Sequence, residues 1–318
     1  MCGIVGYIGK EQAAPILLEG LARLEYRGYD SAGICVAENG VLDVAKCKGR
    51  LKNLAAMTEN GALLHGTAGI GHTRWATHGE PNDITSHPHV SQNGKVALVH
   101  NGIIENYLEI REFLEEKGVQ FTSQTDSEVV AQLLEYCLGL DEVHCMQDAI
   151  YMVLHRIEGA YAFGIVCADD PERIYAARKD APLLLGYGDG CNFIASDVTA
   201  LVKYTRDVVY MEDGEVAILG RDGIQIFNAM ELPIEKEHHH IDWEISAAEK
   251  GGYEHFMLKE IMEEPEALRR AILPRIKDGE VVFDGLQLDI SRYDSIKIIA
   301  CGSSYHVGMV GKYNLEKL

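Results

Sequence analysis

The second half of this sequence holds a dense series of short, strand-like apolar segments, and this series constrains the fold more than any other feature. Turn clusters such as Asp169-Asp170-Pro171 and Gly188-Asp189-Gly190 separate the segments. The predicted strands are Tyr161–Cys167, Ile174–Ala177, Leu183–Tyr187, Phe193–Ala195, Val208–Met211, Val216–Leu219 and Ile224–Phe227. Segments of this length and spacing are typical of antiparallel sheets joined by short turns.

The first half mixes strand and helix patterns, with the helices grouped together. Apolar residues at helical spacing predict helices around Leu17–Leu24, Tyr107–Leu114, Val130–Cys137 and Met146–Ile157. Early strands are predicted at Ile4–Ile8, Gly33–Ala37, Gly69–Trp75 and Val96–Val99. Strands, then helices, then strands again differ from the alternation of a parallel α/β fold. We therefore expect an α+β fold of antiparallel sheets with segregated helices.

The texture of the sequence changes near residue 230. An acidic stretch, 231–270, contains few strand signals, and we interpret it as a linker followed by a helix from about Glu254 that bends or breaks near Pro265. A short apolar strand is predicted at Ile296–Ala300. Too few residues follow it to complete a parallel α/β domain. The predicted division is a complete domain over residues 2–240, then a linker and an incomplete second domain over 241–318.

Charge and composition exclude several classes of function. The chain of 318 residues carries 29 Lys and Arg against 49 Asp and Glu, a net charge of −20, and this disfavours nucleic-acid binding. No apolar run is long enough to cross a membrane, and no signal peptide is visible. The eight cysteines are scattered without paired spacing, so we expect reduced thiols and a cytoplasmic protein.

Cys2 is the first candidate for chemistry, because it stands beside the initiator Met. If Met1 is removed, Cys2 holds a thiol and a free α-amine together. An α-amine titrates near neutral pH and can take the thiol proton, which makes one residue both nucleophile and base. The alternative is a coincidental cysteine at the start of a buried strand.

Three further segments carry polar side chains where strands or helices end. The segment 72–79 presents a guanidinium, an indole, a hydroxyl and an imidazole as a predicted strand enters a loop. In the segment 99–102, the Asn101 side chain and the Gly102 N–H could point at one developing oxyanion. Thr125-Asp126-Ser127-Glu128 opens a helix, and an N-cap with an acidic first turn would explain it without any function.

Taken together, these segments resemble the class II glutamine amidotransferases, whose nucleophile is an N-terminal cysteine. Among them, the resemblance is closest to the isomerising glutamine–fructose-6-phosphate aminotransferases, and it runs from residue 2 to the end of the chain. The segments that carry it are Cys2–Gly6, Glu25–Gly33, His72–Pro81, His100–Asn106 and Phe193–Asp197. The resemblance implies a four-layer α/β/β/α sandwich of antiparallel sheets over residues 2–240.

The resemblance also implies roles for individual residues. Cys2 would attack the glutamine side-chain amide, and Asn101 and Gly102 would form the oxyanion hole. Arg74 would bind the substrate α-carboxylate with its planar fork, and Asp126 would bind the α-ammonium. The same pocket would be lined by Arg27, Thr77 and His78, with Trp75 at its rim. For Trp75 a position in the core is the equal alternative.

A second resemblance lies at the end of the sequence. Ala300–Tyr305 is similar to the first phosphosugar-binding loop of a sugar isomerase domain, with Ser303 and Ser304 as phosphate ligands. The implied full-length reaction moves the amide nitrogen of glutamine to fructose 6-phosphate, giving glucosamine 6-phosphate and glutamate. The chain alone would only hydrolyse glutamine. No cofactor, metal, nucleic acid or membrane partner is implied, and the full-length protein is expected to be a homo-oligomer.

Some alternatives stay open at this point. One is another glutamine amidotransferase, of the phosphoribosyl-pyrophosphate or asparagine type. Another is a non-catalytic module that senses glutamine, although such a module would be expected to have lost Cys2 or Asn101. His87 and His89 could form a metal pair, but a role in stabilising their loop is favoured. His238-His239-His240 is interpreted as part of a solvated linker.

Overall fold

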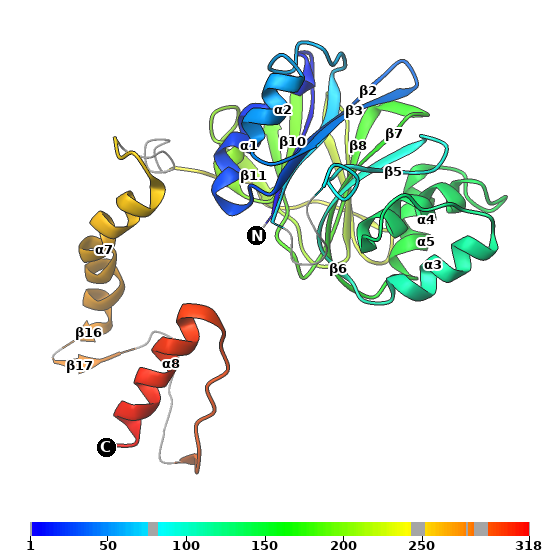
Figure 1. Cartoon of the computed structure of the whole chain (residues 1–318). Helices are drawn as coiled ribbons and strands as arrows, with labels where there is room; N and C mark the ends of the chain where they lie inside the picture. Colours follow the sequence, from blue (N-terminus) through cyan, green and yellow to red (C-terminus); the bar gives the residue numbers. More distant parts are fainter. Residues whose placement is uncertain (1, 76–81, 243–251, 278, 283–291, 318) are drawn as a thin grey trace. The chain divides into compact units, whose positions relative to one another are not determined.

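The structure is a computed structural model, and it describes residues 2–75, 82–242, 252–277, 279–282 and 292–317. The chain divides into two compact units, Met1–Gly252 and Tyr253–Leu318. Each unit is described here by itself (Figure 1).

The first unit contains two antiparallel sheets. Sheet A has eight described strands in the order β15 (His239–His240), β11 (Asp207–Tyr210), β9 (Leu184–Gly188), β10 (Cys191–Ala195), β1 (Gly3–Ile8), β4 (Ala68–Arg74), β2 (Ser31–Glu38) and β3 (Val41–Lys48). Sheet B has seven, in the order β14 (Pro233–Ile234), β13 (Ile224–Phe227), β12 (Glu215–Leu219), β8 (Asp170–Lys179), β7 (Gly159–Cys167), β6 (Val96–Ile104) and β5 (His89–Val90).

Side chains along the central strands alternate between the two faces of each sheet, and this places each strand between two apolar cores. In β1, Ile4 and Ile8 belong to the core shared with sheet B, while Val5 and Tyr7 belong to the core under the helices of sheet A. Successive side chains of a strand point to opposite faces, so one apolar strand can serve both cores. Strand β1 is buried in the middle of the sandwich, which explains why it is apolar at every position rather than at alternate ones.

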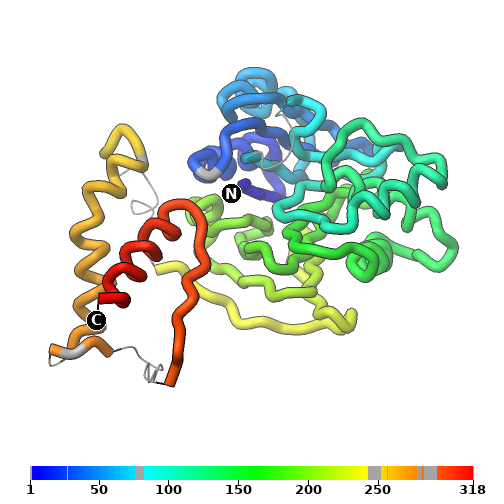
Figure 2. The backbone as a smooth tube through the Cα atoms, turned by 60° about the horizontal axis from the view of Figure 1, so that its bottom comes forward, coloured from blue at the N-terminus to red at the C-terminus, as the bar shows by residue number. Residues whose placement is uncertain are grey.

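Helices cover the outer face of each sheet. Sheet A is covered by α1 (Ala13–Leu24), with the short η1 (Glu25–Arg27) and η2 (Val198–Ala200), and by α2 (Leu51–Met57). Sheet B is covered by α3 (Tyr107–Glu116), α4 (Asp126–Leu138) and α5 (Met146–Leu154). Figure 2 shows residues 107–154, coloured teal to green, gathered on one side of this unit. The result is the expected α+β fold, a four-layer α/β/β/α sandwich of antiparallel sheets.

The second unit contains α7 (Phe256–Ile272), η3 (Leu273–Arg275), the strand pair β16 (Ile276–Lys277) and β17 (Glu280–Val281), and α8 (Gly302–Leu315). Two expectations for it were wrong. Helix α7 continues through Pro265 instead of breaking there. Residues 296–300 form no strand, because a strand needs a hydrogen-bonded neighbour and Ile299 is 96% exposed.

None of the helices that the structure describes is both long enough and apolar enough to span a membrane.

Candidate active site

Cys2 lies beside the end of a neighbouring strand because of the register of sheet A. Strand β1 begins at Gly3, which is paired with Thr73 of β4, so the residue before β1 meets the residues after β4. The N–H of Trp75 donates to Cys2 Sγ at 3.2 Å, and the thiol lies 3.6 Å from the Trp75 carbonyl oxygen. Burial raises the pKa of the Cys2 thiol, while the Trp75 N–H and the charge of Arg74 oppose that rise. A protonated thiol is a weak nucleophile, so Cys2 could act as one only with a base beside it.

Asn101 and Gly102 reach the same place from sheet B, within β6, which continues to Ile104 instead of ending at Val99 as the sequence predicted. The Asn101 side-chain Nδ2 donates to the carbonyl oxygen of Cys2 at 3.1 Å. On its other side, Asn101 Oδ1 lies 2.9 Å from Nε2 of His72. Gly102 has a φ of 134°, and a Cβ there would lie 2.0 Å from the carbonyl oxygen of Ala160. Only glycine permits this backbone path beside the thiol.

Arg74 is the last residue of β4 and is almost completely buried, at 7% exposure. Its Nη1 donates to Thr85 Oγ1 at 3.0 Å. Burial lowers the pKa of Arg74, and the neighbouring acidic groups of Cys2, Asp126 and Asp30 oppose that change. A guanidinium held in this way presents a fixed positive fork, which suits a carboxylate.

Asp126 occupies the first turn of α4 on the opposite side of the pocket. Thr125 is the N-cap of the helix and accepts from the Glu128 N–H at 3.3 Å. Asp126 Oδ2 instead accepts from the N–H of Ile104 at 2.9 Å, and lies 3.9 Å from His100 Nδ1. Thr125 therefore caps the helix, and the Asp126 carboxylate is left to make other contacts.

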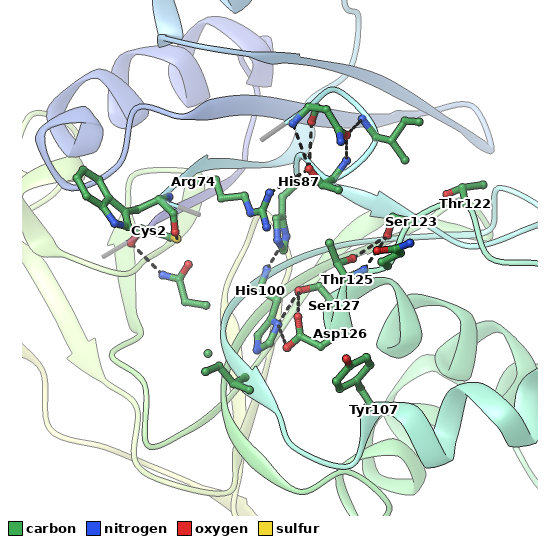
Figure 3. Close-up of a pocket in the computed structure, with 18 residues that line it drawn as sticks. Cys2, Arg74, His87, His100, Tyr107, Thr122, Ser123, Thr125, Asp126 and Ser127 are labelled. Atoms are coloured by element: carbon green, nitrogen blue, oxygen red, sulfur yellow. Dashed lines mark hydrogen bonds and ion pairs between the residues drawn. The ribbon is translucent and has the colours of Figure 1, made fainter. Parts of the chain in front are cut away.

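These groups line one cavity of about 630 Å³, shown in Figure 3. In that view Cys2 and Arg74 lie on one side, and Asp126 and Ser127 lie at the start of α4 on the other. The complete lining is Cys2, Arg74, Trp75, Asn82, Ile84, Thr85, His87, His100–Ile103, Tyr107 and Thr122–Ser127. A thiol, a carboxamide, a cation and an anion thus line one volume.

The other predicted site residues have different positions. Trp75 is 43% exposed and stands edge-on to Tyr29 at 5.2 Å, so it is not a core aromatic. Thr77 and His78 lie outside the described residues, as does the side chain of Arg27, whose backbone belongs to η1. Ser303 and Ser304 are exposed in the first turn of α8.

A cluster of buried histidines adjoins the pocket, and sequence reasoning did not identify it. The rings of His72 and His87 stack with centroids 4.2 Å apart, and His87 meets His89 edge-on at 4.7 Å. His89 Nε2 lies 3.1 Å from Oγ1 of Thr125. Burial lowers the pKa of each of these rings. The sequence marks two of the histidines only as a loop pair flanking Pro88.

Neither histidine motif belongs to a cluster of three or more potential metal ligands in the described part of the chain. No group of three or more His, Cys, Asp or Glu side chains there is placed to hold a metal ion. The interpretation of 238–240 as linker was wrong for His239 and His240, which are exposed but form strand β15 of sheet A, where His240 Nδ1 lies 2.7 Å from Asp207 Oδ1.

Comparisons with known proteins agree on one class. Residues 72–203 match the glutamine amidotransferase domain family. The chain is 53% identical over 320 residues to the glutamine–fructose-6-phosphate aminotransferase (isomerising) of Caldanaerobacter subterraneus subsp. tengcongensis, covering 99% of this chain and 52% of that protein. The corresponding protein of Thermus thermophilus is 48% identical over 319 residues, covering 100% of this chain and 52% of that protein. The chain therefore spans about half the length of the curated relatives it matches.

Solved structures share the fold. The glutamine phosphoribosylpyrophosphate amidotransferase of B. subtilis superimposes with a TM-score of 0.62 and 29% identity, over 72% of this chain and 49% of that one. A glutamine aminotransferase class-II domain protein of Silicibacter pomeroyi, at 14% identity and a TM-score of 0.50, shares the fold alone, over 71% of this chain and 99% of that one.

The two-sheet sandwich, the pocket at Cys2 and the domain match define a class II glutamine amidotransferase domain of the N-terminal-nucleophile type. The identities of 47–53% along the whole chain are more specific. The chain carries the N-terminal glutaminase domain of the isomerising glutamine–fructose-6-phosphate aminotransferases, to which it is similar along its whole length.

Proposed function

We propose that this chain hydrolyses glutamine to glutamate and ammonia, with Cys2 as the nucleophile. One observation carries the proposal: the Cys2 thiol, the Asn101 amide, Arg74 and Asp126 all line a single cavity although they come from both sheets and from α4. Free glutamine carries an α-carboxylate, an α-ammonium and a side-chain amide. This cavity offers a cation, an anion, and a thiol with a carboxamide donor to match them.

The proposed reaction begins with removal of Met1, which frees the α-amine of Cys2. That amine takes the thiol proton as sulfur attacks the amide carbon of glutamine, and the carbonyl oxygen gains negative charge. Asn101 Nδ2 and the Gly102 N–H stabilise this oxyanion. The proton then passes to the departing nitrogen, ammonia leaves, and a γ-glutamyl thioester remains. Water attacks the thioester and releases glutamate and the Cys2 thiol.

Arg74 and Asp126 would bind the two charged ends of the glutamine backbone. Arg74 is buried, so a carboxylate beside it would replace lost hydration of the guanidinium. Arg27, Thr77, His78 and Trp75 complete the proposed substrate-binding set.

In the full-length protein, the ammonia would be transferred to fructose 6-phosphate to give glucosamine 6-phosphate. Residues 241–318 would be the linker and the start of a sugar isomerase domain, with Ser303 and Ser304 as part of a phosphate-binding loop. A cytoplasmic homo-oligomer completes the proposal. Another acceptor is less well supported, because identity is 53% to an aminotransferase acting on fructose 6-phosphate and 29% to the phosphoribosylpyrophosphate amidotransferase.

The proposal is tested by glutamate release from the purified chain, with intact mass used to establish that Met1 is absent. Cys2→Ala should abolish glutamate release, and Cys145→Ala, which removes an exposed cysteine outside the cavity, should not. If Cys2→Ala retains turnover, the mechanism is wrong. If the wild-type chain binds glutamine but releases no glutamate, the non-catalytic sensor is the better description.

A further inference from the structure

A side-chain hydrogen bond connects the two sheets beside the proposed oxyanion hole. His72 lies within β4 of sheet A, paired with Ile4 on one side and Gly33 on the other. Asn101 lies in β6 of sheet B. Their side chains meet across the sandwich, with His72 Nε2 2.9 Å from Asn101 Oδ1.

The hydrogen bonds of Asn101 determine which ring nitrogen of His72 carries the hydrogen. Asn101 Nδ2 donates to the carbonyl oxygen of Cys2, so it is Oδ1 that faces the imidazole. A carboxamide oxygen only accepts, and therefore His72 Nε2 must carry the hydrogen. The ring is 1% exposed, and burial lowers the pKa of His72 to about 3. The ring is thus neutral, with its one hydrogen on Nε2.

The other ring nitrogen agrees with this tautomer. Among the residues that the structure describes, Nδ1 of His72 is buried and has no hydrogen-bond partner. A hydrogen placed there would be an unsatisfied buried donor, at a cost of about 1–3 kcal/mol. A bare nitrogen in the same place leaves only a neutral acceptor without a partner. The surroundings therefore favour the Nε2–H form on both sides of the ring.

The ring is also held in position by its neighbour. His87, labelled in Figure 3, stacks on His72 with an interplanar angle of 25°. His87 Nδ1 accepts the backbone N–H of His100 at 3.3 Å, one residue before Asn101. Strand β6, which carries Asn101, thus also holds the His87 ring that stacks on His72.

The orientation of Asn101 matters because a carboxamide is nearly symmetric in shape. Turned by half a rotation, it would present oxygen lone pairs, instead of N–H groups, toward Cys2 and the place where the oxyanion forms. We propose that His72 is a positioning residue, whose Nε2–H holds the Asn101 carboxamide with Nδ2 toward Cys2. This inference depends on the proposed glutaminase function for its kinetic consequence, but not for the hydrogen bond itself.

The kinetic test compares two substitutions at position 72. His72→Leu removes the donor, whereas His72→Gln retains an N–H near the place of Nε2. We expect His72→Leu to lower kcat for glutamine by about 10-fold or more, up to the 10²–10³-fold expected for loss of the Asn101 donor itself. KM should change little, and His72→Gln should recover most of kcat. Ile70→Val, a buried change on the same strand, is the matched control and should keep kcat.

A double-mutant cycle separates positioning from general loosening of the sandwich. If His72 acts through Asn101, then His72→Leu should cause no further loss of kcat in an Asn101→Ala background. If the losses multiply, if His72→Leu changes KM alone, or if folded His72→Leu keeps wild-type kcat, the proposal is overturned.

A measurement on the unmodified chain covers the case in which His72→Leu does not fold. The ¹⁵N shifts of the His72 ring should report a neutral Nε2–H tautomer between pH 6 and 8. A protonated Nδ1 would overturn the proposal even if every variant were uninformative. Because this readout needs no glutamine turnover, it also distinguishes failure of this inference from failure of the proposed function.

Discussion

Asp126 is the residue whose two interpretations the structure separates. As the opening residue of α4 it could have served only the helix, but Thr125 is the N-cap. The Asp126 carboxylate accepts from Ile104 N–H and lines the cavity that also holds Arg74. Its helical contribution is then limited to a favourable charge in the first turn, worth a few tenths of a kcal/mol up to about 1 kcal/mol.

Asp126→Asn should therefore lower kcat/KM for glutamine by about 10²-fold or more and barely change Tm. Asparagine can still accept from Ile104 N–H, but it cannot neutralise a buried ammonium, and breaking such a pair costs about 2–5 kcal/mol. Asp148→Asn is the matched control: Asp148 also lies in the first turn of a helix, α5, outside the cavity, and accepts the His144 N–H. Glutamate release and thermal melting measure both variants. Normal kcat/KM in Asp126→Asn would return this residue to a structural role.

At the scale of elements, strand β6 shows how one backbone position shapes the site. Gly102 combines a φ of 134° with close approach to the carbonyl oxygen of Ala160 in β7. Gly94, in the turn before β6, also has a positive φ, of 72°, but nothing lies within 4 Å of the place of its Cβ. Alanine substitutions at Gly94 and Gly102 therefore separate the free-energy cost of a positive φ from the cost of a steric clash.

Gly94→Ala should lower the free energy of unfolding by about 1–3 kcal/mol, the cost of a strained backbone position. Gly102→Ala should lower it by about 1–3 kcal/mol more, because a backbone oxygen cannot move aside as a side chain does. Urea unfolding measures both variants. Equal losses would show that β6 and β7 can separate at this point without cost, contrary to the register described here.

Most elements could be predicted where a pattern was long and regular. The apolar positions of α1, α4 and α5 gave helices of nearly the right extent, and the strand series after residue 159 gave β7 to β13. Strand β3 was missed because its burial is mixed and its sequence mixes polar with apolar residues, and helix α2 was missed because it is short and buries only two residues. The prediction of a break at Pro265 was wrong because this part of helix α7 is exposed. There, a helix tolerates a missing backbone hydrogen bond better than it does in a core.

At the scale of the whole molecule, the site exists only because two sheets pack face to face. Cys2 and Arg74 come from sheet A, and Asn101 and Gly102 come from sheet B. The sequence supplied these residues through motif resemblance, since no periodicity places residue 2 beside residue 101. The His72–Asn101 contact was beyond prediction, because it depends on the register of both sheets and on their packing.

The same packing buries the neutral rings of His72, His87 and His89, and we expect this to make the fold sensitive to acid. Burial lowers the pKa of His72 to about 3 and holds the pKa values of His87 and His89 well below their usual range. In the unfolded chain these rings take up protons as the pH falls through about 6.5. Below that pH the unfolded state binds more protons than the folded state, so stability must fall as the pH falls.

Each such ring should remove about 1.4 kcal/mol of stability per pH unit below 6.5, until its folded-state pKa is reached. The loss of unfolding free energy summed over three rings is large against a total stability of about 5–15 kcal/mol.

His87→Asn keeps an acceptor for the His100 N–H but cannot titrate, so it should reduce the slope of unfolding free energy between pH 6 and 5 by about 1.4 kcal/mol per unit. His65→Asn, at an exposed position, is the matched control for the substitution itself. Urea midpoints at pH 5, 6 and 7.5 measure these slopes. An unchanged slope in His87→Asn would mean that this ring is protonated or solvated in the folded protein, and that the packing between the sheets is looser than described.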